Sequence, residues 1–178
     1  MAVGFNAGAS VTTGAENVFI GGNAADSITT GIRNVAIGHA ALQTEDAHGY
    51  NVALGNRTLQ NLNAGVDGYN TAVGNQAGQA MTTGVQNTIL GSFAGDALTT
   101  GSNNTIIGYG AEASAVGASN EITLGDNNIS LLRIPGLGST DGHVLTYETA
   151  SGGIVLKAGG GGGGASSLND LSDVSIRS

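Results

Sequence analysis

The chain has no cysteine and no tryptophan, and only 4% of its 178 residues are aromatic. Without cysteine there is no disulfide and no thiolate metal site. Charged residues make up 10% of the chain, well below the roughly 25% of an average soluble domain. The net charge of −8 at pH 7 argues against the basic surface of a nucleic-acid-binding protein. An ordinary globular enzyme is therefore a poor fit to this composition.

Long apolar runs and proline are also scarce. No stretch reaches the roughly 18 apolar residues of a membrane span, so no membrane insertion is expected. Residues 1–9 lack the basic and apolar segments of a secretory signal. The single proline, Pro135, excludes collagen, and 40% apolar residues argue against a disordered linker. What the chain has in excess is glycine, at 32 positions.

Much of this glycine belongs to an internal repeat. A five-residue unit recurs every 17 residues, and once after 19. It consists of asparagine, an apolar or threonine residue, then alanine or a larger apolar residue, an apolar residue and glycine. Its asparagines are Asn17, Asn34, Asn51, Asn70, Asn87 and Asn104, and its glycines are Gly21, Gly38, Gly55, Gly74, Gly91 and Gly108. A variant unit ends at Gly125, and Met1 to Gly4 fits the same period. About eight repeats are therefore expected over residues 1–127.

The repeat predicts an all-β fold, a parallel β-roll or β-solenoid, because 17 residues suit one coil with two short strands and two tight turns. The glycines are expected where the backbone needs a positive φ or a close approach, and the asparagines are expected to stack as a ladder. Period-two alternation predicts that the first and third residues of each strand face the core. Those expected core positions are Val18/Ile20, Val35/Ile37, Val52/Leu54, Thr71/Val73, Thr88/Leu90 and Thr105/Ile107.

A thin roll of small residues leaves one apolar flank exposed. We expect identical copies to cover this flank, as a homotrimer about the long axis of the roll. After the repeats, 128–158 is expected to form a strand over 128–134 and a hairpin from strands at 143–148 and 153–157. Residues 159–178 are expected to be a polyglycine linker, or an extended segment around a three-fold axis, followed by a tail.

The repeat unit resembles a known class of sequences. Residues 70–78, Asn-Thr-Ala-Val-Gly-Asn-Gln-Ala-Gly, closed by Thr82-Thr83-Gly84, look like the repeats of phage tail fibres and related virion proteins, many of which carry an endosialidase-type chaperone domain. They are also similar to the head repeats of trimeric autotransporter adhesins, which are left-handed parallel β-rolls. The resemblance covers Met1 to about Arg133. It implies a trimeric fibre.

Candidate chemical sites are weak in this sequence. Gly159–Gly164 contains the spacing of a dinucleotide-binding loop but no helix or ribose-binding acid follows. Ser139, Asp141 and His143 are interpreted as turn residues rather than a triad, and His39, His48 and His143 lack metal-ligand spacing. The recurring acids Asp26, Asp67, Asp96 and Asp126 are interpreted as solvated turn residues, with an ion site as the alternative. Tyr50, Tyr69 and Tyr109 favour packing between protomers over a sugar-contacting patch.

The function expected from the sequence is a non-enzymatic structural part of a bacteriophage virion, with no catalytic residue, cofactor or metal. It would be a rigid tail fibre or fibre segment that joins other virion proteins through one terminus and takes part in host attachment. The absence of a chaperone domain and of a membrane anchor from this sequence favours a virion part assembled in the host cytoplasm. The alternatives are a capsid-attached head fibre or decoration protein, a module that binds host glycan, and, least favoured, a polysaccharide depolymerase.

Overall fold

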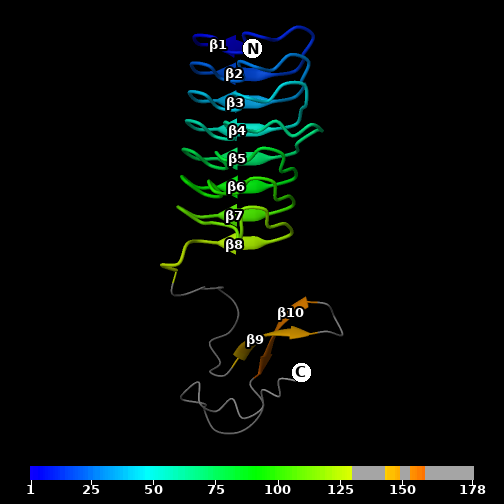
Figure 1. Cartoon of the computed structure of the whole chain (residues 1–178). Helices are drawn as coiled ribbons and strands as arrows, with labels where there is room; N and C mark the ends of the chain where they lie inside the picture. The colour runs from blue at the N-terminus through cyan, green and yellow to red at the C-terminus, as the bar shows by residue number, and fades with distance from the viewer. Residues whose placement is uncertain (130–142, 149–152, 159–178) are drawn as a thin grey trace. The chain divides into compact units, whose positions relative to one another are not determined.

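A stack of short parallel strands forms the first part of the chain. The computed structural model describes residues 1–129, 143–148 and 153–158. Its first eight strands are β1 (Ala2–Val3), β2 (Val18–Ile20), β3 (Val35–Ile37), β4 (Val52–Leu54), β5 (Thr71–Val73), β6 (Thr88–Leu90), β7 (Thr105–Ile107) and β8 (Ile122–Leu124). They form one sheet in chain order, and every strand pairs in parallel with the next (Figure 1). The predicted fold class, an all-β parallel β-solenoid, is confirmed.

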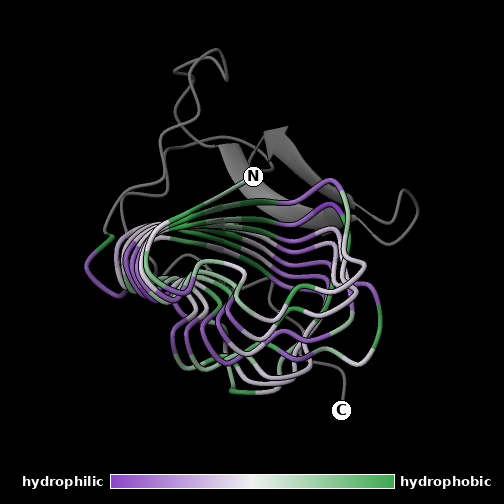
Figure 2. Ribbon diagram, turned by 90° about the horizontal axis from the view of Figure 1, so that it is seen from above, coloured by the Kyte–Doolittle hydropathy of each residue, from purple (hydrophilic) through white to green (hydrophobic). Residues whose placement is uncertain are grey.

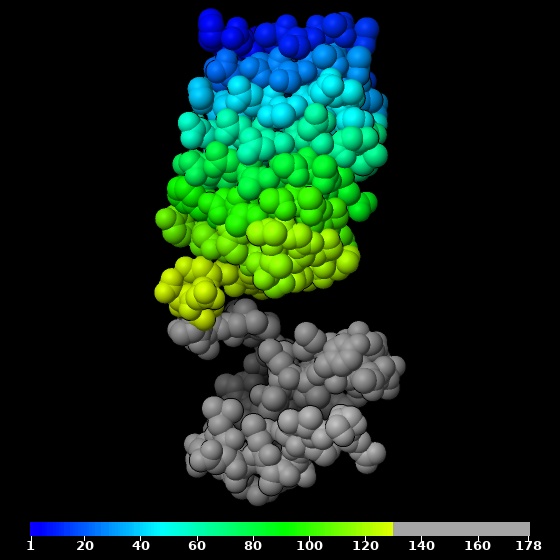
Figure 3. Space-filling view, in the orientation of Figure 1, coloured from blue at the N-terminus to red at the C-terminus, as the bar shows by residue number. Residues whose placement is uncertain are grey.

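The seven strand-to-strand steps keep the repeat in register. Val35 of β3 pairs with Val52 of β4, which in turn pairs with Thr71 of β5 across the 19-residue step. The two extra residues therefore do not shift the sheet. Seen along the stack, successive coils lie over one another (Figure 2), and in the space-filling view they form layers in chain order (Figure 3). There are about seven turns from β1 to β8.

Each coil contains one strand, so the expectation of two strands per coil is wrong. The opposite side of each coil consists of turns, and left-handed residues interrupt it at Ala25, Leu42 and Leu59, with φ of 50°, 51° and 50°. A strand cannot continue through that conformation. Backbone bonding between coils persists nonetheless, because Ala25 N–H donates to the Ala41 carbonyl at 2.9 Å.

The core is built from the middle residue of each strand from β2 to β7, so the predicted core face is also wrong. Phe19, Ala36, Ala53, Ala72, Ile89 and Ile106 are at most 2% exposed. The first and third strand residues, predicted to be buried, point outward and are partly or largely exposed. Alternation shows which residues share a face, but both faces are apolar here and the pattern does not choose between them.

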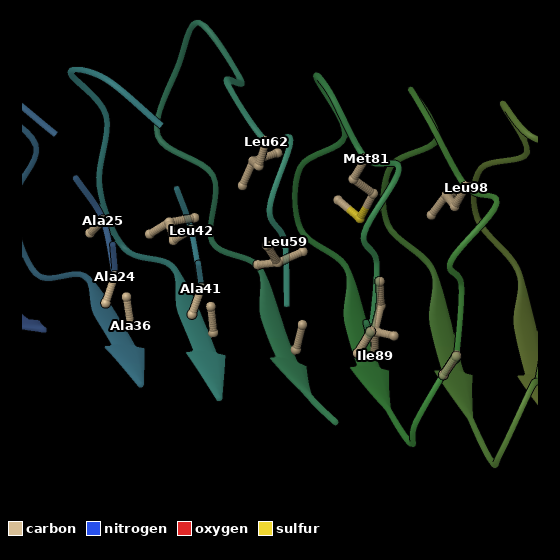
Figure 4. Close-up of a cluster of buried hydrophobic side chains, with 14 of the residues drawn as sticks. Ala24, Ala25, Ala36, Ala41, Leu42, Leu59, Leu62, Met81, Ile89 and Leu98 are labelled. Carbon is tan, nitrogen blue, oxygen red and sulfur yellow. The ribbon is translucent and has the colours of Figure 1, made fainter. Parts of the chain in front are cut away.

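Two further columns on the turn side complete the core. One consists of fully buried alanines: Ala24, Ala41, Ala77, Ala94 and Ala111. The other holds larger apolar side chains, among them Leu62, Met81 and Leu98 (Figure 4). The small alanine column lets the turn side approach the sheet closely, which is why this fold needs few aromatic residues.

The second unit of the chain contains an antiparallel hairpin. Its strands are β9 (His143–Glu148) and β10 (Gly153–Ala158), with Glu148 paired to Gly153, as the sequence predicts. Asn128 lies in a turn rather than in the expected strand, and residues 130–134, like the polyglycine run and the tail, lie outside the described residues. The described parts of the chain contain no helix, hence none that could cross a membrane.

Candidate functional site

The asparagine column forms the polar spine of the roll. The side-chain oxygen of each asparagine accepts a hydrogen bond from the backbone N–H that begins the next repeat; for Asn70 this donor is Asn87, at 3.0 Å. The amide nitrogen of Asn70 donates to the Gly84 carbonyl at 3.0 Å, where its own coil ends. Asn34, Asn51, Asn70, Asn87 and Asn104 are at most 1% exposed. These contacts occupy both ends of the side-chain amide, so the column is structural and presents no free group to a ligand.

The repeat glycines lie where neighbouring coils approach most closely. Their φ angles fall between 132° and 141°, a region that residues with a Cβ rarely adopt. A Cβ on Gly21 would lie 2.5 Å from the carbonyl oxygen of Gly38 in the next coil. The glycines therefore support coil stacking.

The outward side of the sheet is an apolar surface without charge. We call it the outer face; it consists of Val3, Val18, Ile20, Val35, Ile37, Val52, Leu54, Thr71, Val73, Thr88, Leu90, Thr105, Ile107, Ile122 and Leu124. Leu54, Leu90 and Leu124 are 41%, 47% and 52% exposed. Scattered exposed leucines are ordinary, but a contiguous apolar strip along a whole sheet is typical of an interface.

A second column borders the outer face, at the position just before each asparagine. We call it the rim column; it consists of Glu16, Arg33, Tyr50, Tyr69, Gln86, Asn103 and Asn120. All seven residues are left-handed, with φ from 49° to 63°. A non-glycine residue in this conformation costs about 1 kcal/mol, and the coil bonding on either side holds it there.

The first four side chains of the rim column are joined to one another. Arg33 Nε lies 2.7 Å from Glu16 Oε2, and Arg33 Nη1 donates to the Tyr50 hydroxyl at 2.8 Å. This contact with Glu16 raises the pKa of Arg33 further above its usual value. The Tyr50 and Tyr69 rings stack with centroids 4.9 Å apart, and Tyr69 remains 54% exposed. These contacts link the four side chains along the rim column.

A buried carboxylate marks the coil before the 19-residue step. Glu45 occupies the position that Ile28 and Leu62 fill in the neighbouring coils, and it is fully buried. Its Oε1 accepts the backbone N–H groups of Asp46 and His48, and its Oε2 accepts that of Ala64, at 3.1, 3.3 and 3.4 Å. Glu45 thus satisfies backbone donors where the repeat is interrupted.

One acid pair lies on the turn side. Glu112 Oε1 accepts the Asp96 backbone N–H at 3.0 Å. Partial burial, and then the hydrogen bond and charge of the Asp96 carboxyl, raise the pKa of Glu112 to about 7. The two carboxyls do not come with a third ligand: among the described residues no three His, Asp or Glu side chains gather as a metal site would need.

The remaining candidate residues do not form one site. Asp26 accepts a hydrogen bond from the neighbouring Ser27 hydroxyl, and Asp67 accepts the Gly49 backbone N–H of the preceding coil. Asp126 accepts hydrogen bonds from the backbone and side chain of Asn128, which lower its pKa. Tyr109 packs edge-on against Phe93, away from the Tyr50–Tyr69 stack. His143 lies in β9, whereas Ser139, Asp141 and Gly159–Gly164 lie outside the described residues.

A second amide ladder, not predicted from the sequence, runs along the turn side. Gln79 Nε2 donates to Gln60 Oε1 at 2.9 Å, Gln60 to Gln43 at 3.0 Å, and Gln43 to Asp26 at 3.4 Å. The repeat period itself was the available signal, since these residues share one column. The role of Arg33 could not be found in this way, because no other repeat has arginine there.

Comparison with known proteins returned no relative. No protein-family model, curated protein or solved structure matches this chain.

Proposed function

We propose that this chain is a structural rod segment: three copies bury their outer faces against one another about a common long axis, as part of a bacteriophage virion fibre. The observation that carries the proposal is the outer face. It runs along all eight strands, contains no charged residue, and exposes large aliphatic side chains such as Leu90, at 47%. Full burial of such a side chain contributes about 1.5–3 kcal/mol, so a strip of them favours association strongly.

Identical copies are the partner that best fits this surface. The outer face repeats once per coil, so a second copy aligned with the first offers the same outer-face residues at every level. Closed cyclic symmetry is how such side-by-side contacts end without uncontrolled growth. The three-fold symmetry in particular follows the resemblance of the repeats to trimeric fibre and adhesin sequences.

The assignment to a virion rests on the same resemblance of the 17-residue unit. In this role the protein is mechanical: stacked coils stiffen the rod, and one terminus joins it to tail, baseplate or capsid proteins. It would assemble in the host cytoplasm with no cofactor and no catalytic group. A capsid-attached fibre and a host-glycan-binding module are the competing assignments.

Sedimentation equilibrium of the full chain tests the association. We expect a mass near three chains, a reduced mass for Leu90→Asp, and an unchanged mass for Thr83→Asp, an exposed position outside the outer face. A charge buried at Leu90 would be unpaired and costly, whereas one at Thr83 would stay in water. A stable monomer in the unsubstituted chain would refute the proposal.

Imaging and binding measurements separate the competing assignments. Antibody-labelled virus particles should show density on fibres, and the label would distinguish tail from capsid attachment. Binding of the purified protein to host cells or lipopolysaccharide would favour the glycan-binding module. Loss of polysaccharide viscosity on incubation would overturn the non-enzymatic role.

A further inference from the structure

The outer face alone specifies the axial alignment of neighbouring copies only weakly. Its third-position column reads Ile20, Ile37, Leu54, Val73, Leu90, Ile107 and Leu124, a run of similar aliphatic side chains. Moving one copy by one coil, about 4.8 Å, brings each of these residues beside another of the same kind. Only the contact of the end layers is lost. Repetitive apolar surfaces slip in this way unless other residues oppose it.

Two features of the described chain break this repetition, and both change near the 19-residue step. In the first-position column, Val18, Val35 and Val52 are followed by Thr71, Thr88 and Thr105, and then by Ile122. In the rim column, the charged and aromatic cluster of Glu16 to Tyr69 is followed by the plain amides Gln86, Asn103 and Asn120. Neither change is needed for coil stacking, because the sheet register and the asparagine ladder continue through both.

We propose that the Arg33–Tyr50–Tyr69 cluster, together with the valine-to-threonine change between β4 and β5, fixes the axial register between copies of this chain. This inference rests on the proposed association of copies through the outer face. The cluster borders that face directly, since Tyr50 and Tyr69 immediately precede the asparagines before β4 and β5. The partner surface is therefore the same region of a second copy.

The chemistry of the cluster suits this role. Tyrosine and arginine are the residue types that most often dominate interface energies, and they do so when they are ordered and then desolvated. Here an ion pair, a hydroxyl contact at 2.8 Å and a ring stack already join the side chains to one another. In the aligned arrangement valine-bearing coils lie level with valine-bearing coils, and the clusters lie level with one another. A one-coil slip places a valine layer beside a threonine layer and Tyr69 at the level of Gln86, so it loses contacts that the aliphatic column cannot replace.

The absence of cysteine allows a direct test by disulfide mapping. Single substitutions Leu54→Cys, Val73→Cys, Leu90→Cys and Ile107→Cys are made in the full chain, pairs of variants are co-expressed, and linked peptides are identified by mass spectrometry after oxidation. In the natural background we expect linkage between the same positions of two chains, with little linkage between adjacent positions such as 73 and 90.

The register variant is Arg33→Gln with Tyr50→Gln and Tyr69→Gln, which gives these three coils the type of side chain found at Gln86. We expect the ratio of adjacent-position to same-position linkage to rise by about tenfold or more, the effect of losing one dominant interface contribution. The matched control, Gln86→Ala with Asn103→Ala, should leave the ratio unchanged. A second variant, Thr71→Val with Thr88→Val and Thr105→Val, keeps strand-favouring residues, removes the valine-to-threonine change and should raise the ratio in the same direction.

The outcomes separate this inference from the proposed function. An unsubstituted chain that sediments as a monomer, or as a trimer in which no outer-face position links, overturns the proposed function and the inference with it. If trimers link at outer-face positions and the ratio stays constant in both variants, only the register inference is overturned. If the register variant dissociates while the control does not, the cluster holds copies together rather than aligning them, and the inference is again wrong.

Discussion

Truncating one asparagine of the ladder should destabilise the roll far more than truncating an asparagine on its surface. Asn70 is the most completely bonded member that we find: its oxygen accepts from the Asn87 backbone and side chain at 3.0 and 3.2 Å, and its nitrogen donates to Gly84 and Asn51 at 3.0 and 3.1 Å. Asn70→Ala would leave the Asn87 N–H and the Gly84 carbonyl buried without these partners. Each such buried group costs about 1–3 kcal/mol, so we expect a loss of about 2–5 kcal/mol.

The matched control is Asn75→Ala in the same repeat. Asn75 is exposed, and no hydrogen bond of its side chain occurs among the described residues, so its truncation should change stability by no more than about 0.5 kcal/mol. Urea unfolding of both variants at one fixed protein concentration measures the difference, because association would otherwise contribute to it. Amide hydrogen exchange adds a local readout: the Asn87 N–H should lose protection in Asn70→Ala alone. Equal unfolding free energies for the two variants would refute the ladder as a source of stability.

Four further substitutions probe two glycines, the buried Glu45 and the partly buried Glu112. At Gly91 the φ is 138° and an added Cβ would clash with the next coil, so Gly91→Ala should lower the free energy of unfolding by at least about 3 kcal/mol. At Gly65 the φ is 71° and the surrounding space is open, so Gly65→Ala should lower it by about 1 kcal/mol. Thermal unfolding compares the two variants. Glu45→Ala removes the acceptor of three backbone N–H groups and should lower stability by about 2–4 kcal/mol in urea unfolding, and a cost near zero would show that water replaces the carboxylate. The raised pKa of Glu112, about 7 against about 4.5 unfolded, means that the folded state holds the proton more tightly. The contribution of Glu112 to folding stability is therefore complete below pH 4.5 and is lost as the pH rises through 7. Because Glu112 is only partly buried, solvent screening limits the change to about 1 kcal/mol; Glu112→Gln should flatten this part of the stability profile, and an unchanged slope would contradict the assignment.

Sequence periodicity was sufficient to predict the fold because each coil stacks on a copy of itself. A column of asparagines or glycines at a fixed spacing has to line up in space once the coils align, so the sequence gives both the strands and their parallel pairing. The hairpin of β9 and β10 was predictable for a different reason, namely two strand-like runs joined by a short polar turn.

Several features could not be predicted in this way. The buried side of the sheet was assigned wrongly because the alternation in Val35-Ala36-Ile37 is compatible with either face, and the choice depends on what lies across the core. The single strand per coil also follows from left-handed residues such as Leu42, whose conformation cannot be predicted from its residue type. Glu45 is polar in sequence and buried in space because neighbouring coils supply its hydrogen-bond donors.

The sequence by itself therefore determined the repeat, the solenoid, and the columns of asparagine and glycine, since all of these depend on spacing along the chain. Tertiary structure alone decided which apolar face is buried, which is left exposed, and that Arg33, Tyr50 and Tyr69 form one cluster. The physical reason is that a period fixes which residues align from coil to coil, whereas the packing of each coil around its core fixes the direction in which the aligned residues point.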